Sequence, residues 1–180
     1  NPLGGIILFT KLLMEEHELE DTAVQDLRRI LKDAERCRDT VKELLEFSRQ
    51  KRYMMQPCDI NQAISRTMFL LENQTIFQNI EIEKDMAPSL PTVMADVQQL
   101  NHVFMNIILN AADAMEGKGE LKIEIIPFDK YVNINITDTG KGISKQRFNK
   151  VFEPGYTSKK RGWGLGLSLA KRIIEDYHNG

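Results

Sequence analysis

The chain has 180 residues, of which 42% are hydrophobic and 28% are charged, a composition typical of a soluble globular protein. Its net charge of -2 gives no case for nucleic acid or an anionic membrane as a partner. Cys37 and Cys58 form neither a metal pattern nor a disulfide framework, and no apolar run approaches the roughly twenty residues of a membrane span, so we expect a cytoplasmic protein.

The first fifty or so residues show helical periodicity in two arms. The first arm, from 2 to about 17, is short and strongly apolar, and the second runs from about 22 to 52 with Asp21 as its expected cap. Apolar and small residues of the second arm recur every seven positions, which is typical of a helix in a coiled coil or bundle. The two rows are Leu27, Ala34, Val41 and Ser48, and Ala23, Ile30, Cys37 and Leu44.

This apolar stripe is wider than a two-stranded seam, because Val24, Leu31 and Leu45 flank the two rows. A wide stripe favours a four-helix arrangement. Two short arms cannot bury it alone, so we expect a homodimer through the helical hairpin. The alternative is a hairpin that packs within its own chain on the second domain.

The segment 53–59, which contains Pro57, is interpreted as a domain boundary or a first edge strand. We therefore expect a hairpin domain at 1–53 and a second domain at 54–180. The elements predicted beyond the boundary are a helix at 60–77, a strand around 80–83, a short strand at 92–95, a helix at 96–115, strands at 120–128 and around 132–136, and a helix from about 167 to 177.

This order of elements predicts an α+β sandwich with a mixed sheet covered on one face by helices. The whole fold is then a helical hairpin, forming a dimeric four-helix bundle, followed by that sandwich.

The helix predicted at 96–115 carries two different faces. One is the apolar stripe of a buried helix, formed by Leu100, Val103, Phe104, Ile107, Ala111 and Met115. The other is a polar row formed by His102, Asn106, Asn110 and Asp113. Buried amides and carboxylates are costly unless they are hydrogen-bonded or metal-bound, so this row either faces water or holds a ligand.

Three further motifs follow the polar row. They are Asp138-Thr-Gly140-Lys-Gly142-Ile143, Phe152-Glu-Pro154-Gly-Tyr-Thr157 and Gly162-Trp-Gly164-Leu165-Gly166-Leu167. In this order and spacing, the row and the three motifs resemble the N, G1, F and G2 boxes of the ATP-binding domain of sensor histidine kinases. Those kinases share a superfamily with DNA gyrase and the heat-shock chaperone ATPases. The resemblance covers nearly the whole chain, although family members usually add a final strand after residue 180.

The resemblance implies ATP and Mg²⁺ as cofactors. Asp138 would accept a hydrogen bond from the amino group of adenine, on the core face of its strand. The amide oxygen of Asn110 would bind Mg²⁺, which prefers hard oxygen ligands. Asn106 stands where the ATPases usually carry a glutamate, and because an amide cannot take a proton at neutral pH, it favours phosphoryl transfer over hydrolysis. His102 is expected to be a helix-face residue, and Asp113 departs from many kinases, which place a basic residue close by.

The segment 152–161 is expected to be a mobile lid hinged at Gly155 and Gly162, with Phe152 anchored in the core or docked on the hairpin. Trp163 would stack at the pocket rim or pack under the loop. Backbone amides of the glycine-rich loop, at the start of a helix, suit a triphosphate. The predicted nucleotide-binding residues besides Asn110 and Asp138 are Gly140, Gly142, Ile143, Thr157, Lys159, Lys160, Arg161, Gly162, Gly164, Leu165, Gly166 and Leu167.

The opening Asn1-Pro2-Leu3 resembles the end of the kinase H box, so we expect the phospho-accepting histidine to lie about four residues upstream of this chain. His17 is rejected as the acceptor, because Thr22 stands where the motif has a proline. Any membrane or sensor segment would also lie upstream.

The resemblance then implies that this chain binds Mg-ATP without phosphorylating itself. In the intact protein, the γ-phosphoryl group would move to the histidine and then to an aspartate of a response-regulator receiver domain, docked on the hairpin near 3–9. Two alternatives stay open: an ATPase or serine kinase of the same superfamily, and a non-catalytic, nucleotide-sensing dimerisation module.

Overall fold

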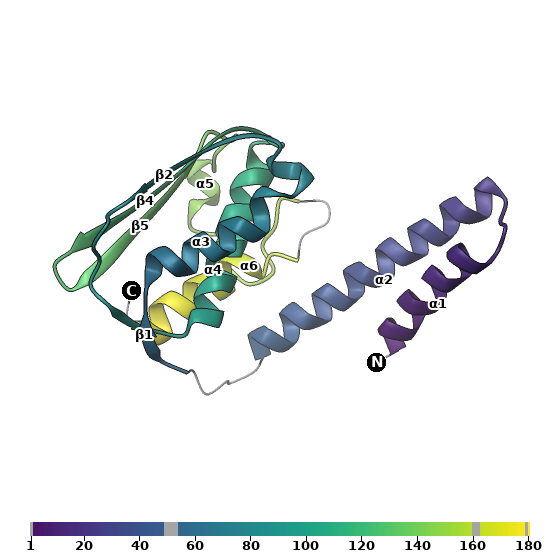
Figure 1. Cartoon of the computed structure of the whole chain (residues 1–180), viewed down its shortest axis with the longest axis horizontal. Coiled ribbons are helices and arrows are strands. Elements are labelled where there is room, and N and C mark those ends of the chain that lie inside the picture. Colours follow the sequence, from purple (N-terminus) through teal and green to yellow (C-terminus); the bar gives the residue numbers. More distant parts are fainter. Residues whose placement is uncertain (1, 49–53, 160–162, 179) are drawn as a thin grey trace. The chain divides into compact units, whose positions relative to one another are not determined.

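The computed structural model describes residues 2–48, 54–159, 163–178 and 180 (Figure 1). The chain divides into two compact units, Asn1–Gln50 and Lys51–Gly180. Among the described residues, no helix combines the length and the apolar character that crossing a membrane requires.

The first unit is a hairpin of two helices, α1 (Pro2–Glu16) and α2 (Asp21–Ser48), which lie side by side (Figure 1). Asp21 is the first helical residue of α2 rather than the N-cap residue before the helix. A carboxylate in the first turn interacts favourably with the positive end of the helix dipole. The end of the predicted second arm, at 49–52, lies outside the described residues.

Most of the apolar surface of this hairpin is not covered by the hairpin itself. Ile7, Thr10 and Ala34 are buried, and Lys11 forms an ion pair with Glu35 at 3.5 Å. The large apolar side chains that stay exposed are Ile6, Leu8, Phe9, Leu13, Ile30 and Val41. The side chains of Leu44, Leu45 and Ser48 lie outside the described residues.

The second unit is built on a three-stranded sheet in the order β2 (Asn79–Met86), β4 (Lys118–Phe128), β5 (Tyr131–Asp138). Strands β2 and β4 are parallel, and β4 and β5 form an antiparallel hairpin, so the sheet is mixed. A separate antiparallel ribbon joins β1 (Gln56–Cys58) to β3 (Val93–Ala95). The helices lie on one face of the sheet (Figure 1), which confirms the predicted sandwich.

Alternation along β4 separates the core from the open face of the sheet. Leu121, Ile123 and Ile125 are fully buried under the helices. Between them, Lys122 lies on the open face, 3.3 Å from a carboxylate oxygen of Glu83 and 3.2 Å from one of Glu124. Hydrogen bonds to these two carboxylates raise the pKa of Lys122. The open face is therefore polar around Lys122, and the core lies on the other side.

The helix predicted at 60–77 is shorter in the structure. Asp59 caps α3 (Ile60–Glu72) by accepting a hydrogen bond from the backbone N–H of Gln62 at 3.2 Å. The helix ends there because Gln74 takes an extended conformation, and a 3₁₀ turn, Thr75–Phe77, then buries Phe77.

The helix that carries the polar row is α4 (Val97–Ala114). The carboxylate of its N-cap, Asp96, accepts hydrogen bonds from the backbone N–H groups of Gln98 and Gln99 at 3.0 and 3.2 Å. The predicted apolar stripe is buried except at Ile107, which is half-buried. Ile108, which was not part of the predicted stripe, is fully buried in the core. The core face of α4 is therefore rotated slightly from the prediction.

Two short helices complete the unit, α5 (Lys145–Phe148) and α6 (Gly166–Arg172). A π-helical turn, Ile173–Tyr177, continues α6, so together they occupy the helix predicted at 167–177. His178 follows: its Nε2 accepts a hydrogen bond from the backbone N–H of Asp96 at 3.1 Å. This bond ties the end of the chain to the start of α4.

Candidate functional site

The polar row of α4 is the meeting point of three separate segments. His102, Asn106 and Asn110 are half-buried, and Asp113 is exposed. Gly166, at the start of α6, packs so closely on Asn106 that a Cβ on it would lie 3.1 Å from the amide oxygen. From the lid, the ammonium of Lys159 donates to Asn110 Oδ1 at 2.6 Å and to Asp113 Oδ2 at 2.5 Å. The row thus holds its polar groups against the lid and the glycine-rich loop.

Asp138 ends β5, near the C-terminal end of α4. Its register partner on β4 is the fully buried Leu121, but Asp138 itself is exposed. The strand position of Asp138 follows the buried row, as expected, but its carboxylate is open to solvent rather than buried. Asp138 Oδ1 accepts a hydrogen bond from the backbone N–H of Gly140 at 2.9 Å. Oδ2 has no partner among the described residues, so it can accept one from a ligand.

Gly140 is held against the last turn of α4. A Cβ there would lie 2.7 Å from the carbonyl carbon of Ala114 and 2.8 Å from its side chain, so only glycine fits. The backbone N–H of Lys141 donates to the carbonyl of Ala114 at 3.2 Å. These contacts fix the loop that follows Asp138 to α4. Ile143, further along the loop, is exposed.

Thr139 also fixes this loop, and sequence reasoning did not single it out. Its hydroxyl accepts a hydrogen bond from the backbone N–H of Glu120 at 2.9 Å and donates to the sulfur of Met115 at 3.7 Å. Its own N–H donates to the carbonyl of Glu120 at 3.2 Å. A hydroxyl directly after a strand-ending aspartate was the available signal, but its partners lie 19 and 24 residues away.

The two ends of the lid are joined at their base. The backbone N–H of Gly155 donates to the carbonyl of Gly164 at 3.1 Å. Gly164 has φ of +67°, and a Cβ on it would lie 2.3 Å from the carbonyl oxygen of Tyr156. Between them, Thr157 Oγ1 accepts a hydrogen bond from the backbone N–H of Lys159 at 3.1 Å.

The structure describes some of the other predicted residues in and near the lid. Lys160, Arg161 and Gly162 lie outside the described residues, while Leu165 and Leu167 are half-buried on either side of Gly166. Phe152 is 40% exposed, with the Lys171 ammonium 5.5 Å from its ring centroid. Phe152 therefore does not anchor the lid in the core. Trp163 is 52% exposed.

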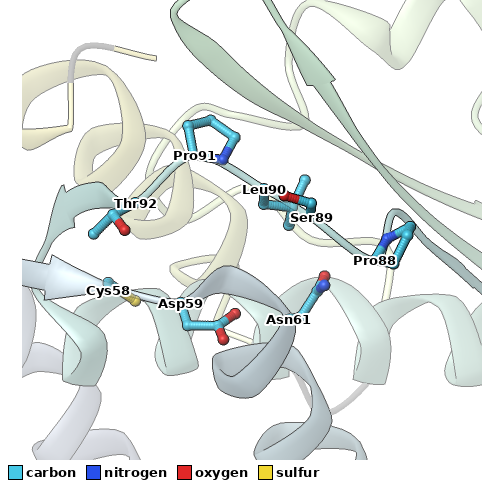
Figure 2. Close-up of a pocket in the computed structure, with 8 residues that line it drawn as sticks. All are labelled: Cys58, Asp59, Asn61, Pro88, Ser89, Leu90, Pro91 and Thr92. Atoms are coloured by element: carbon cyan, nitrogen blue, oxygen red, sulfur yellow. The ribbon is translucent and has the colours of Figure 1, made fainter.

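A small pocket of about 220 Å³ lies elsewhere, between the start of α3 and the segment 88–92 (Figure 2). Asn61 lines it and donates from Nδ2 to the carbonyl of Ala87 at 2.9 Å. Cys58 also lines it, and burial, together with the nearby Asp59 charge, raises the pKa of its thiol. None of the predicted nucleotide-binding residues lines this pocket.

The polar row suits one kind of metal ion. Within the described part of the chain, no three His, Cys, Asp or Glu side chains cluster as a metal site. Mg²⁺ is commonly held by only one or two protein oxygens, with phosphate oxygens and waters completing its shell. Asn110 Oδ1 already accepts a cationic group, the Lys159 ammonium. The donor set therefore fits an ion that arrives with a phosphate ligand, and not one held by the protein alone.

The sequence matches two family models. Residues 95–180 match the histidine kinase-, DNA gyrase B- and HSP90-like ATPases, and residues 1–52 match the His kinase A (phospho-acceptor) domain. The fold and site thus define a phospho-acceptor hairpin followed by an ATPase-type nucleotide-binding domain. The two matches together cover most of the chain, whose first part belongs to the phospho-acceptor domain family and whose second part belongs to the family of these ATPases.

The similar proteins are kinases of that family. The chain is 30% identical to sensor histidine kinase ZraS of Escherichia coli, over 98% of this chain and 38% of ZraS. It is 28% identical to sporulation kinase B of Bacillus subtilis, over 99% of this chain and 42% of that kinase. The chain therefore spans about two-fifths of these relatives.

Solved structures show the same fold. Full-length ShkA in complex with AMPPNP superposes with a TM-score of 0.81 at 23% identity, over 97% of this chain and 38% of that one. Histidine kinase ThkA, in complex with response regulator protein TrrA, has a TM-score of 0.72 at 25% identity, over all of this chain and 52% of that one.

Proposed function

We propose that this chain is the catalytic core of a sensor histidine kinase, which binds Mg-ATP in its second unit and directs the γ-phosphoryl group to a histidine. The observation that carries the proposal is the arrangement along α4. Asn106 contacts the glycine-rich loop, Asn110 faces a cation from the lid, and the exposed carboxylate of Asp138 lies beyond the end of the helix.

Asp138 is proposed to recognise the adenine base. Its free oxygen is an acceptor, and the exocyclic amino group of adenine is a matching donor. Gly140 occupies the other oxygen and fixes the carboxylate in one orientation. A guanine base would present a carbonyl at that position, and two acceptors would face each other, so we expect selection of adenine.

Asn110 is proposed to hold Mg²⁺ through its amide oxygen, and the backbone at Gly164, Gly166 and Leu167 to bind phosphate. Once bound, Mg²⁺ supplies charge neutralisation for the triphosphate. The AMPPNP in the ShkA complex supports a triphosphate in this fold. Lys159, Lys160 and Arg161 are proposed to add positive charge beside it.

Asn106 favours phosphoryl transfer over hydrolysis. A carboxylate at this place on α4 could take a proton from water, whereas an amide cannot do so at neutral pH. The nucleotide would therefore be held until an acceptor side chain arrives. This argues against the ATPase alternative and supports transfer to a histidine on a phospho-acceptor domain.

The hairpin is proposed to form a homodimer and to receive a response regulator near 3–9. The exposed apolar side chains of α1 and α2 support a dimer, because burying them needs a second hairpin. The ThkA–TrrA complex supports the regulator as partner. The regulator's aspartate would then take the phosphoryl group from the histidine.

Titration calorimetry and a phosphate-release assay on this chain test the proposal. We expect one Mg-ATP per chain, with no steady release of phosphate. Asn110→Ala should weaken Mg-ATP binding by about tenfold or more, the size of one lost charge-assisted contact. Asn135→Ala, on the open face of the sheet, is the matched control and should change nothing. Steady phosphate release would mean an ATPase, and absence of binding would refute the site.

A further inference from the structure

Among the described residues of the lid, the ammonium group of Lys159 makes a polar contact with α4. Lys159 Nζ lies 2.6 Å from Asn110 Oδ1 and 2.5 Å from Asp113 Oδ2. Asn110 and Asp113 are three residues apart on the helix, so their side chains emerge on the same face. Lys159 is 49 and 46 residues away from them in sequence. The ammonium is thus the link that brings the lid onto the polar row.

The strength of this link suits reversible contact. The side chains of Lys159 and Asp113 are 43% and 45% exposed, and ion pairs with such exposure contribute at most about 1 kcal/mol. A polyphosphate carries several negative charges, so it competes well with a single carboxylate for the same ammonium. The pair therefore holds the lid without preventing its rearrangement.

Asp113 would be unfavourable beside a nucleotide if it stood alone. It lies one helical turn from Asn110, the proposed Mg²⁺ ligand, and an unpaired carboxylate there would repel phosphate oxygens. Lys159 cancels that charge. An ammonium has three donors, of which two are engaged here, by Asn110 and Asp113. A third donor is left to bind phosphate.

We propose that Asp113 is a positioning residue: it holds the Lys159 ammonium over α4, and when nucleotide binds, Lys159 leaves Asn110 for a phosphate oxygen while Asp113 retains it. This inference rests on the proposed Mg-ATP site. It follows that Lys159 and Mg²⁺ use the amide oxygen of Asn110 in turn, because two cations cannot share it closely. In the nucleotide-free protein, Lys159 therefore keeps the lid in place.

A double-mutant cycle tests this role through nucleotide affinity. Asp113→Asn keeps the size of the side chain but weakens its hold on Lys159, and we expect about two- to fivefold weaker Mg-ATP binding, the range for the loss of an exposed ion pair. Lys159→Met should weaken binding at least as much. In the Lys159→Met background, Asp113→Asn should cause no further loss, because the residue acts only through the lysine.

The matched control is Glu116→Gln, which removes a carboxylate just beyond the end of α4 that pairs with Lys141 at 3.8 Å. It should leave affinity unchanged. Adenosine, which lacks phosphates, should bind all four proteins of the cycle equally. An equal loss of adenosine binding, or a full additional loss from Asp113→Asn in the double variant, would overturn the proposal.

A second readout uses the nucleotide-free protein. We expect faster amide hydrogen exchange over 155–159 in Asp113→Asn and in Lys159→Met than in the unmodified chain, because the lid loses its link to α4. Trp163, the single tryptophan of the chain, reports the same change by fluorescence. Unchanged exchange would overturn the inference while leaving Mg-ATP binding intact, whereas failure of the unmodified chain to bind Mg-ATP would overturn the proposed function itself.

Discussion

The binding role proposed for Asp138 depends on the surroundings of its carboxylate. Asp138 continues the inward-facing row of β5 and is nevertheless exposed. One oxygen is fixed by the N–H of Gly140, and the neighbouring Thr139 joins the loop to Glu120 and Met115. The free oxygen is therefore both oriented and accessible, as a base-recognition group must be.

Replacing Asp138 by Asn should weaken nucleotide binding. One acceptor becomes an NH₂ donor that faces the donor of adenine, and we expect a loss of about tenfold or more in affinity. ATP and adenosine should lose affinity equally, because the contact is to the base. Calorimetry with both ligands measures this. Asp129→Asn, in the turn between β4 and β5, is the control, and an effect confined to ATP would contradict base recognition.

The two cysteines should differ in reactivity. Cys58 is 4% exposed, and burial raises the pKa of its thiol, whereas Cys37 is exposed. A raised pKa keeps Cys58 protonated to higher pH, and the thiolate is the reactive form. At neutral pH we expect a disulfide reagent to label one thiol quickly and the second only after unfolding. Cys37→Ser should abolish the fast phase; a fast phase that survives would contradict this assignment.

At the scale of elements, α4 joins the core to the site. Its apolar face packs in the core, and its polar row faces the lid and the glycine-rich loop. The loop after the lid is restricted by Gly164, whose positive φ and contact with Tyr156 leave no room for a side chain. The site therefore depends on the closed base of the lid as well as on α4.

Substituting Gly164 by Ala should distort the lid base. A Cβ 2.3 Å from the Tyr156 carbonyl oxygen must displace backbone, so we expect Mg-ATP affinity to fall by more than about tenfold, beyond the roughly 1 kcal/mol of φ strain alone. Gly117→Ala is the matched control, because Gly117 also has positive φ, +79°, but a Cβ on it would lie at an ordinary contact distance, 3.4 Å from the carbonyl oxygen of Ile76. Equal losses in the two variants would show that strain, and not the lid contact, determines affinity.

The periodicity of apolar residues predicted most helices and strands, as well as the polar row. Side chains on one face recur every three to four residues in a helix and every two residues in a strand. The predicted helix extends to 77, because the apolar Ile76 and Phe77 continue its periodic pattern. In the structure, the extended conformation of Gln74 ends helical structure before these residues. The Lys159–Asp113 pair could not be predicted, because sequence spacing does not reveal a contact across 46 residues. Exposure of Asp138 and Phe152 likewise depends on tertiary packing, which local sequence patterns do not encode.

In the whole molecule, the helical hairpin leaves large apolar side chains exposed to solvent. Ile30 and Val41 are 49% and 46% exposed on α2, and exposed apolar rows of this kind mark a helix–helix interface. The proposed dimerisation and the proposed nucleotide binding use different units, so they should be separable by mutation.

Ile30→Glu should disrupt the dimer. A buried, unpaired carboxylate at an apolar interface is strongly unfavourable, so sedimentation equilibrium should show a shift from dimer to monomer. Mg-ATP affinity should stay within about twofold, because the site lies in the second unit. Arg28→Glu, two positions away and exposed, is the control and should remain dimeric. A monomeric unmodified chain would contradict the proposed homodimer.

The most direct measurement of the central claim uses the full-length protein, which restores the expected upstream histidine. It is incubated with γ-labelled ATP and Mg²⁺, and the stability of the protein-bound label is then followed in acid and in alkali. We expect label that is lost in acid and kept in alkali, as for phosphohistidine, and none on the 180-residue chain. Label that resists acid, label on His17, or phosphate release without protein label would contradict it.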